Sequence, residues 1–127
     1  DFQDYSFWRR ELPVKTYSTT FSRLINSKNT NQNCLVAHSG ETLHGLVHYI
    51  FHADNWETTD VCYLQDLFTL KEMRQQGIAK ALIQAVYEAA DTNGTPSVYW
   101  MTQDFNQSAR KLYDQVASLT PFIIYER

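Results

Sequence analysis

The fold of this chain is decided by one stretch, Phe68-Thr69-Leu70-Lys71-Glu72-Met73-Arg74-Gln75-Gln76-Gly77-Ile78-Ala79-Lys80. An apolar run typical of a strand leads into a polar turn with one glycine, and a helical pattern follows at once. The first N–H groups of a helix have no partner inside the helix, and the helix dipole favours negative charge beside them. The order strand, turn, helix therefore predicts an anion site suited to a phosphate group. A turn with a lone glycine can also simply end a strand, so the spacing alone leaves a plain structural turn open.

The rest of the chain alternates between strand and helix patterns. Ile78–Thr92 has apolar residues at helical spacing and is followed by the helix stop Asn93-Gly94. The other patterns predict helices at Thr16–Asn26 and Ser108–Ala117, the latter capped by Asn106 or Ser108, and strands at Cys34–His38, Leu43–His52, Val61–Leu70, Ser97–Thr102 and Pro121–Tyr125. This succession predicts an α/β fold with a mixed central sheet flanked by helices.

Length, net charge and the distribution of apolar residues exclude several classes of protein. The 127 residues fit a single domain, residues 1–127, and the net charge of −3 argues against a nucleic-acid partner. No apolar run approaches the roughly 20 residues of a membrane span, and no secretory leader is visible. Cys34 and Cys62 sit in strand-like runs and are expected to be reduced thiols of the core, which predicts a cytoplasmic protein.

Three histidines, His44, His48 and His52, follow one another at intervals of four. On a helix they would line one face and could hold a metal. The residues between them are β-branched and aromatic, which favours a strand, and on a strand such positions lie about 13 Å apart. That distance is too long for a shared ion, so no metal site is expected, although one of these side chains can face a substrate cleft.

Two further positions are unusual. Gln65-Asp66 places a carboxylate inside an apolar strand, which indicates either a functional group or a hydrogen-bonded aspartate at a strand edge. Tyr113 lies on the predicted helix after the Trp100 strand, where the pattern alone predicts a core aromatic.

Three motifs together resemble a known family. Arg74-Gln75-Gln76-Gly77-Ile78-Ala79 is similar to the (Gln/Arg)-x-x-Gly-x-(Gly/Ala) signature of the GCN5-related N-acetyltransferases (GNAT). Tyr63–Phe68 resembles the strand before that signature, and Asn106–Tyr113 resembles the family's Asn-x-x-Ala-x-x-x-Tyr helix. Gly94–Trp100 and Pro121–Arg127 are most similar to the small histone/polyamine acetyltransferases first described in yeast. The likeness covers Leu43–Arg127 well, and it implies that the family's first strand and most of its first helix are missing from this chain.

The resemblance implies an enzyme that moves an acetyl group from acetyl-CoA to a primary amine of a polyamine, an amino acid, an aminoglycoside or a lysine side chain, without a metal. The backbone of Arg74, Gln75, Gln76, Gly77, Ile78, Ala79 and Lys80 would hold the pyrophosphate of the cofactor. The strand edge at Leu67, Phe68 and Thr69 would pair with the pantetheine arm. Asn106, with Ala109 of the same motif, would contact the cofactor, and Tyr113 would act as general acid toward the leaving thiolate.

One departure bears on the chemistry. Related polyamine acetyltransferases often carry Glu where this chain has Gln65, and an amide cannot accept the proton of an ammonium. The base is then Asp66 or a water-mediated route, and Gln65 orients the amine. The same departure supports an alternative, a non-catalytic acyl-CoA-binding sensor.

The aromatic C-terminal run Pro121–Tyr125 has an apolar edge. Such an edge favours pairing with another subunit, so a homodimer or a higher assembly is expected. The alternative is an edge strand covered within one chain.

Overall fold

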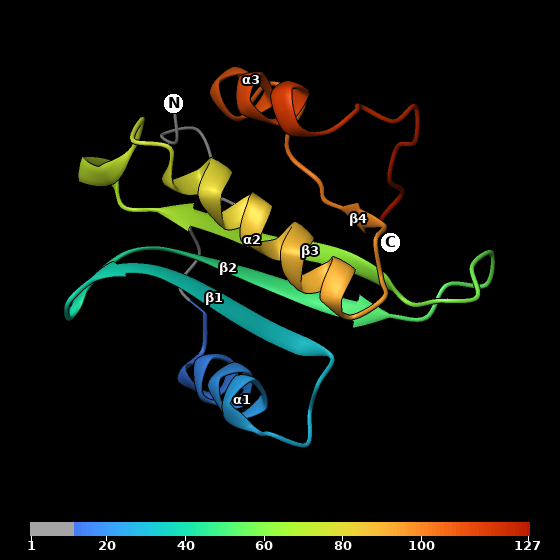
Figure 1. Cartoon of the computed structure of the whole chain (residues 1–127), viewed down its shortest axis with the longest axis horizontal. Helices are drawn as coiled ribbons and strands as arrows, with labels where there is room; N and C mark the ends of the chain where they lie inside the picture. The colour runs from blue at the N-terminus through green and yellow to red at the C-terminus, as the bar shows by residue number, and fades with distance from the viewer. Residues whose placement is uncertain (1–11) are drawn as a thin grey trace.

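The computed structural model describes residues 12–127. Its elements run in the order α1 (Val14–Ile25), β1 (Gln32–Ser39), β2 (Thr42–His52), β3 (Val61–Thr69), the 3₁₀ turn η2 (Lys71–Met73), α2 (Ile78–Thr92), β4 (Val98–Tyr99) and α3 (Gln107–Val116). In Figure 1, α2 lies across one face of the sheet, α1 lies beside β1, and α3 follows β4. No helix within residues 12–127 is long and apolar enough to cross a membrane.

The four strands form one mixed sheet in the order β1-β2-β3-β4. β2 is antiparallel to both of its neighbours, β1 and β3, whereas β4 runs parallel to β3. β4 pairs with β3 at only two positions, Cys62 with Val98 and Tyr63 with Tyr99. Beyond Tyr63, no strand of the described chain lies beside β3 on that side. The remaining backbone groups of this edge are therefore open to a ligand that can add as a strand.

The core lies between α2 and the sheet. Alternate residues of β2, Val47, Tyr49 and Phe51, are buried, because successive side chains of a strand point to opposite faces. They meet one face of α2, where the buried residues recur at helical spacing. The whole cluster contains Val47, Tyr49, Phe51, Cys62, Leu64, Leu82, Ile83, Val86 and Ala90. This packing fixes the start of α2 relative to the end of β3.

The helix Ile78–Thr92 has the predicted bounds, and α1, α3 and the first three strands agree with prediction within a few residues. Two predicted strands need correction. Ser97–Thr102 is reduced to the short strand β4. The strand predicted at Pro121–Tyr125 is wrong, since residues 117–127 form neither helix nor strand. Strand-forming residues need a hydrogen-bonded neighbour, and the described chain places none beside this segment.

Both cysteines are free thiols. Cys62 is fully buried in the core, as predicted, whereas Cys34 is only partly buried. Burial raises the pKa of the Cys62 thiol from 9.0 to about 11 and also raises the pKa of Cys34.

Candidate functional site

The predicted anion turn lies between the end of β3 and α2. Gln75 (φ 63°) and Gly77 (φ 79°) are both left-handed, a conformation that glycine adopts without strain. Gly77 occupies the N-cap of α2, and no capping side chain bonds to the first amides of the helix. A Cβ built on Gly77 meets nothing within 4 Å, so a ligand can approach this backbone closely. Uncapped helix amides beside an open glycine suit an anion.

The side chains of this turn bond back to its own backbone. The Arg74 Nε–H donates to the Thr69 carbonyl oxygen at 3.4 Å, and the Gln76 Nε2–H donates to the Glu72 carbonyl oxygen at 3.4 Å. Two buried polar atoms in the described chain, Thr69 Oγ1 and His44 Nδ1, have no hydrogen-bond partner. Both residues adjoin the turn, because Thr69 ends β3 and the Leu70 N–H donates to the His44 carbonyl oxygen at 2.9 Å. Unpartnered donors and acceptors here fit a site completed by a polar ligand.

Gly45 of β2 is a part of the site that the sequence patterns did not single out. A Cβ at this position would lie 2.7 Å from the Phe68 carbonyl oxygen and 3.3 Å from both Ile78 Cγ2 and Leu82 Cδ1. The absent side chain therefore lets the first turns of α2 and the end of β3 approach each other. The only available signal was a glycine inside a strand pattern, which indicates close backbone contact.

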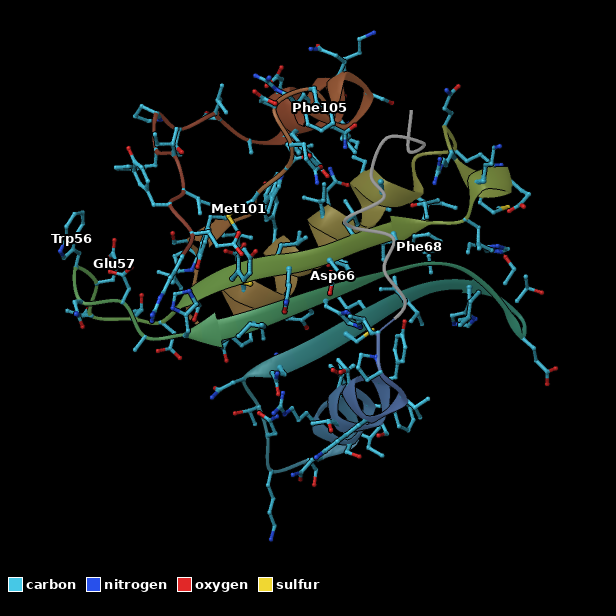
Figure 2. The ribbon with its side chains drawn as sticks, turned by 180° about the vertical axis from the view of Figure 1, so that it is seen from behind. Trp56, Glu57, Asp66, Phe68, Met101 and Phe105 are labelled. Atoms are coloured by element: carbon cyan, nitrogen blue, oxygen red, sulfur yellow. The ribbon has the colours of Figure 1, made fainter. Side chains whose placement is uncertain are left out.

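A β-bulge interrupts β3 within its open edge, beyond the last pair with β4. Tyr49 pairs with Leu64, whereas the adjacent His48 pairs with Asp66, so Gln65 has no partner on β2. Figure 2 looks onto the face of the sheet opposite α2 and shows Asp66 and Phe68 along β3 on that face. Bulges are frequent beside active sites, where they turn a side chain toward the chemistry.

Within residues 12–127 the Asp66 carboxylate has one close hydrogen-bond partner. Its Oδ2 lies 2.9 Å from His48 Nδ1, and the side chains of His48 and Asp66 are 25% and 58% exposed. The aspartate is thus a solvent-facing, hydrogen-bonded group rather than a buried one. The strand predicted for the three histidines is confirmed, and no group of three His, Cys, Asp or Glu side chains within residues 12–127 is placed to hold a metal.

The third motif forms α3 and its N-terminus. Asn106 is the N-cap: its Oδ1 accepts from the Ala109 N–H at 3.3 Å, and its Nδ2 donates to Thr102 Oγ1 at 3.4 Å. Tyr113 packs edge-to-face on Trp100, with ring centroids 5.4 Å apart, and adjoins the core cluster, as its pattern predicts. Burial raises the pKa of the Tyr113 hydroxyl above 10, so this group keeps its proton at neutral pH.

Comparison with known proteins identifies the family of this chain. The sequence model of the Acetyltransferase (GNAT) family matches residues 2–117. The chain belongs to the GNAT acetyltransferase family. It is also 34% identical over 123 residues to the D-amino-acid N-acetyltransferase HPA3 of Saccharomyces cerevisiae (strain ATCC 204508 / S288c), a match that covers 95% of this chain and 76% of HPA3.

Solved structures share the GNAT fold. A transcriptional regulator from Bacillus halodurans C-125 superposes with a TM-score of 0.83 and 22% identity, over 99% of this chain and 86% of that one. The structure of AAC(6')-Iy in complex with the bisubstrate analog CoA-S-monomethyl-acetylneamine gives a TM-score of 0.79 and 19% identity, over 91% of this chain and 80% of that one. At these identities the likeness shows the fold alone.

In this GNAT acetyltransferase the predicted site residues fall into two groups. The turn from Arg74 to Lys80 and the edge from Leu67 to Thr69 are continuous with each other and lie between β3 and α2. Ala109 and Tyr113 lie on α3, and Asn106 caps it. Tyr87 of α2 holds this helix by donating its hydroxyl to the Val116 carbonyl oxygen at 2.9 Å. In the sequence His48 is distinguished only by its spacing to other histidines. Its bond to Asp66 crosses between two strands and has no signal in the sequence.

Proposed function

We propose that this acetyltransferase moves the acetyl group of acetyl-CoA to a primary amine of a polyamine, an amino acid, an aminoglycoside or a lysine-bearing peptide. One observation carries the proposal. The free edge of β3 leads from Asp66 directly to the uncapped N-terminus of α2. An extended ligand with an anionic group at one end and a reactive group at the other would follow this path.

Acetyl-CoA, when bound, supplies an activated thioester. The amides of the Arg74–Lys80 turn would hold its pyrophosphate, because helix N-termini favour phosphate. The β3 edge at Leu67, Phe68 and Thr69 would bond the pantetheine amides as an added strand. Asn106 caps α3 and would help to fix the end of this path.

Asp66 would accept the proton of the ammonium, since the amine must be neutral before it attacks. Its exposed carboxylate is well suited to meet a cationic substrate. Tyr113 would protonate the departing thiolate, and its raised pKa keeps that proton in place at neutral pH. Gln65 would orient the amine through its amide group.

The relatives support this chemistry. HPA3 is named as a D-amino-acid N-acetyltransferase, and the AAC(6')-Iy complex holds an analog that contains CoA. Amino acids are therefore the first acceptors to test. A sensor that binds acyl-CoA without turnover would need no proton acceptor, whereas the structure provides Asp66 beside the open edge.

The experiment is a panel of amino acids of both hands, polyamines, aminoglycosides and lysine peptides, each incubated with acetyl-CoA while thiol release is followed. We expect amine-dependent release with at least one class. Tight acetyl-CoA binding without release from any amine would favour the sensor instead. Identifying the acetylated product by mass spectrometry separates transfer from simple hydrolysis.

We also propose a homodimer. Leu119, Phe122, Ile123, Ile124 and Tyr125 are between 66% and 91% exposed. A cluster of apolar side chains of this kind is typical of an interaction surface. Light scattering coupled to size-exclusion chromatography should give twice the chain mass, and replacing Phe122 and Ile124 by Ser should give the monomer. A monomeric wild type would contradict the proposal.

A further inference from the structure

His48 and Asp66 form an ion pair that joins β2 to β3. His48 Nδ1 lies 2.9 Å from Asp66 Oδ2, and the two residues are direct partners in the β2–β3 ladder. A neutral imidazole bonded to a carboxylate in this way carries its proton on Nδ1 and donates it. The bond fixes the rotamer of Asp66 and leaves Oδ1 for another partner.

The exposures decide which member of the pair meets the substrate. Asp66 is 58% exposed and lies on β3, the strand with the open edge, whereas His48 is 25% exposed and lies one strand further in. An imidazole that acts as the base with an orienting aspartate has the opposite arrangement, with the carboxylate buried behind it. Asp66 is therefore the member of the pair that can meet the substrate, and His48 holds it from the inner side.

Among residues 12–127, the groups that surround His48 leave Asp66 as its charged partner. Cys34 of β1 is opposite His48 in the ladder, and burial raises the pKa of this thiol, which favours its neutral form. Along β2, His44 Nε2 bonds Ser39 Oγ at 2.9 Å, and His52 Nε2 bonds the Tyr99 hydroxyl at 2.7 Å. On β3, the pKa of Tyr63 is raised by burial and by the nearby charge of Asp66, so that phenol is also neutral at physiological pH.

We propose that His48 is a positioning residue for the proton-accepting carboxylate, and that its protonation switches the reaction off. With neutral His48 the pair carries one negative charge, which attracts an ammonium and can take its proton. With protonated His48 the pair is neutral overall, so it no longer attracts the cationic amine. The inference rests on the proposed acetyl transfer.

In the proposed transfer, the ammonium gives one proton to Asp66, which passes it to solvent, and the neutral amine nitrogen bonds to the carbonyl carbon of the thioester. The carbon–sulfur bond then breaks, and the electron pair leaves with sulfur, which takes a proton from Tyr113. The second proton lost from nitrogen restores the Tyr113 hydroxyl through water. The products are the amide, the free thiol and one proton.

The test is the pH profile of kcat/KM for the amine in His48→Asn. The Asn amide nitrogen replaces Nδ1 as a donor but has no charge to gain. Because histidine changes charge between pH 5 and 8, the ratio of variant to wild-type kcat/KM should rise by about tenfold or more as pH falls from 8 to 5. The ionisation of the amine substrate is common to both proteins and cancels in this ratio.

His38→Asn is the matched control, because His38 is an exposed histidine whose Nδ1 also makes a 2.9 Å bond, to the Gly40 carbonyl oxygen. Its ratio to wild type should stay flat with pH. In an Asp66→Asn background, His48→Asn should no longer change the profile, since the two residues act as a unit. The KM for acetyl-CoA and the thermal melting curve should be unchanged in His48→Asn, which shows that the variant folds.

A flat ratio for His48→Asn, with wild-type turnover intact, would overturn this inference and leave the proposed function standing. Absence of turnover in the wild type with every amine would overturn both. A profile change that persists in the Asp66→Asn background would show that His48 acts without the carboxylate, and it would also overturn the inference.

Discussion

Replacing Gly45 by Ala tests whether close packing between β2, β3 and α2 holds the anion turn in place. The added Cβ would lie 2.7 Å from the Phe68 carbonyl oxygen, and real Cβ contacts essentially never fall below 3.0 Å. The backbone of β3 must therefore move by at least 0.3 Å, the difference between those distances. Overpacking of this kind costs about 1–3 kcal/mol, and the loss of unfolded-state freedom returns about 0.4–1 kcal/mol. The net destabilisation should be about 1–2 kcal/mol.

The displacement also has a functional consequence. Ile78 is the first residue of α2, and its Cγ2 would lie 3.3 Å from the new Cβ. A shift there moves the amides that we propose for the pyrophosphate, so the KM for acetyl-CoA should rise severalfold. For a domain of this size, 1–2 kcal/mol corresponds to a fall in Tm of about 4–8 °C.

The assay pairs thermal denaturation with steady-state kinetics and uses Gly94→Ala as the control. Gly94 is left-handed (φ 69°) with nothing within 4 Å of its Cβ position, and it lies at the far end of α2. An alanine there costs about 1–2 kcal/mol through backbone strain alone. It should lower Tm by a similar amount without changing the KM for acetyl-CoA. If Gly45→Ala melts like wild type, or if both variants share one KM, the reasoning is refuted.

Two further predictions concern single side chains. Tyr113→Phe keeps the ring packed on Trp100 and removes only the hydroxyl, so kcat should fall by about 10²–10⁴ while the KM for acetyl-CoA changes little; an unchanged kcat would remove Tyr113 from the acid role. Burial raises the pKa of the Cys62 thiol from 9.0 to about 11, so the folded protein favours the neutral thiol. The contribution of this thiol to the free energy of unfolding is therefore complete below pH 9 and is lost as pH rises through about 11. That shift corresponds to about 2.7 kcal/mol, and urea denaturation should show wild type losing about this much more stability than Cys62→Ala between pH 8.5 and 11.5; equal losses would contradict it.

The elements of this fold could be predicted where local pattern and final packing agree. Ile78–Thr92 has a single apolar face and a glycine stop, and it forms a helix with those bounds. The segment Pro121–Tyr125 has equally clear strand residues, yet it forms no strand. A helix satisfies its hydrogen bonds internally, whereas a strand depends on a neighbour that the segment itself does not specify. The error at the C-terminus therefore arises from pairing rather than from propensity.

The same distinction between local pattern and strand pairing applies to the candidate site. Residues close together in the sequence make the turn from Arg74 to Lys80 and the cap at Asn106. In the structure the turn contains left-handed residues, and Asn106 caps α3. The pairing of His48 with Asp66 and the contact of Gly45 with Phe68 join residues about 20 positions apart. Such contacts depend on the register between strands, which the local pattern does not define.

The bulge at Gln65 explains why a carboxylate can occupy this strand. Tyr49 pairs with Leu64 and Ile50 with Tyr63, so an uninterrupted ladder would pair His48 with Gln65 and would turn Asp66 toward the core. Because Gln65 is instead left out of the ladder, Asp66 moves to the open face opposite His48.

The spacing of the apolar residues of β3 reflects the bulge at Gln65. Cys62 and Leu64 belong to the core and Leu67 packs against it, so the interval between core-facing residues is first two and then three. A strand gains one residue in this way only at a bulge. The intervals between these core-facing residues can be read from the sequence. They indicate which face Asp66 occupies only when the pairing with β2 is known. The bulge at Gln65 thus brings Asp66, the carboxylate that we propose as the proton acceptor, opposite His48.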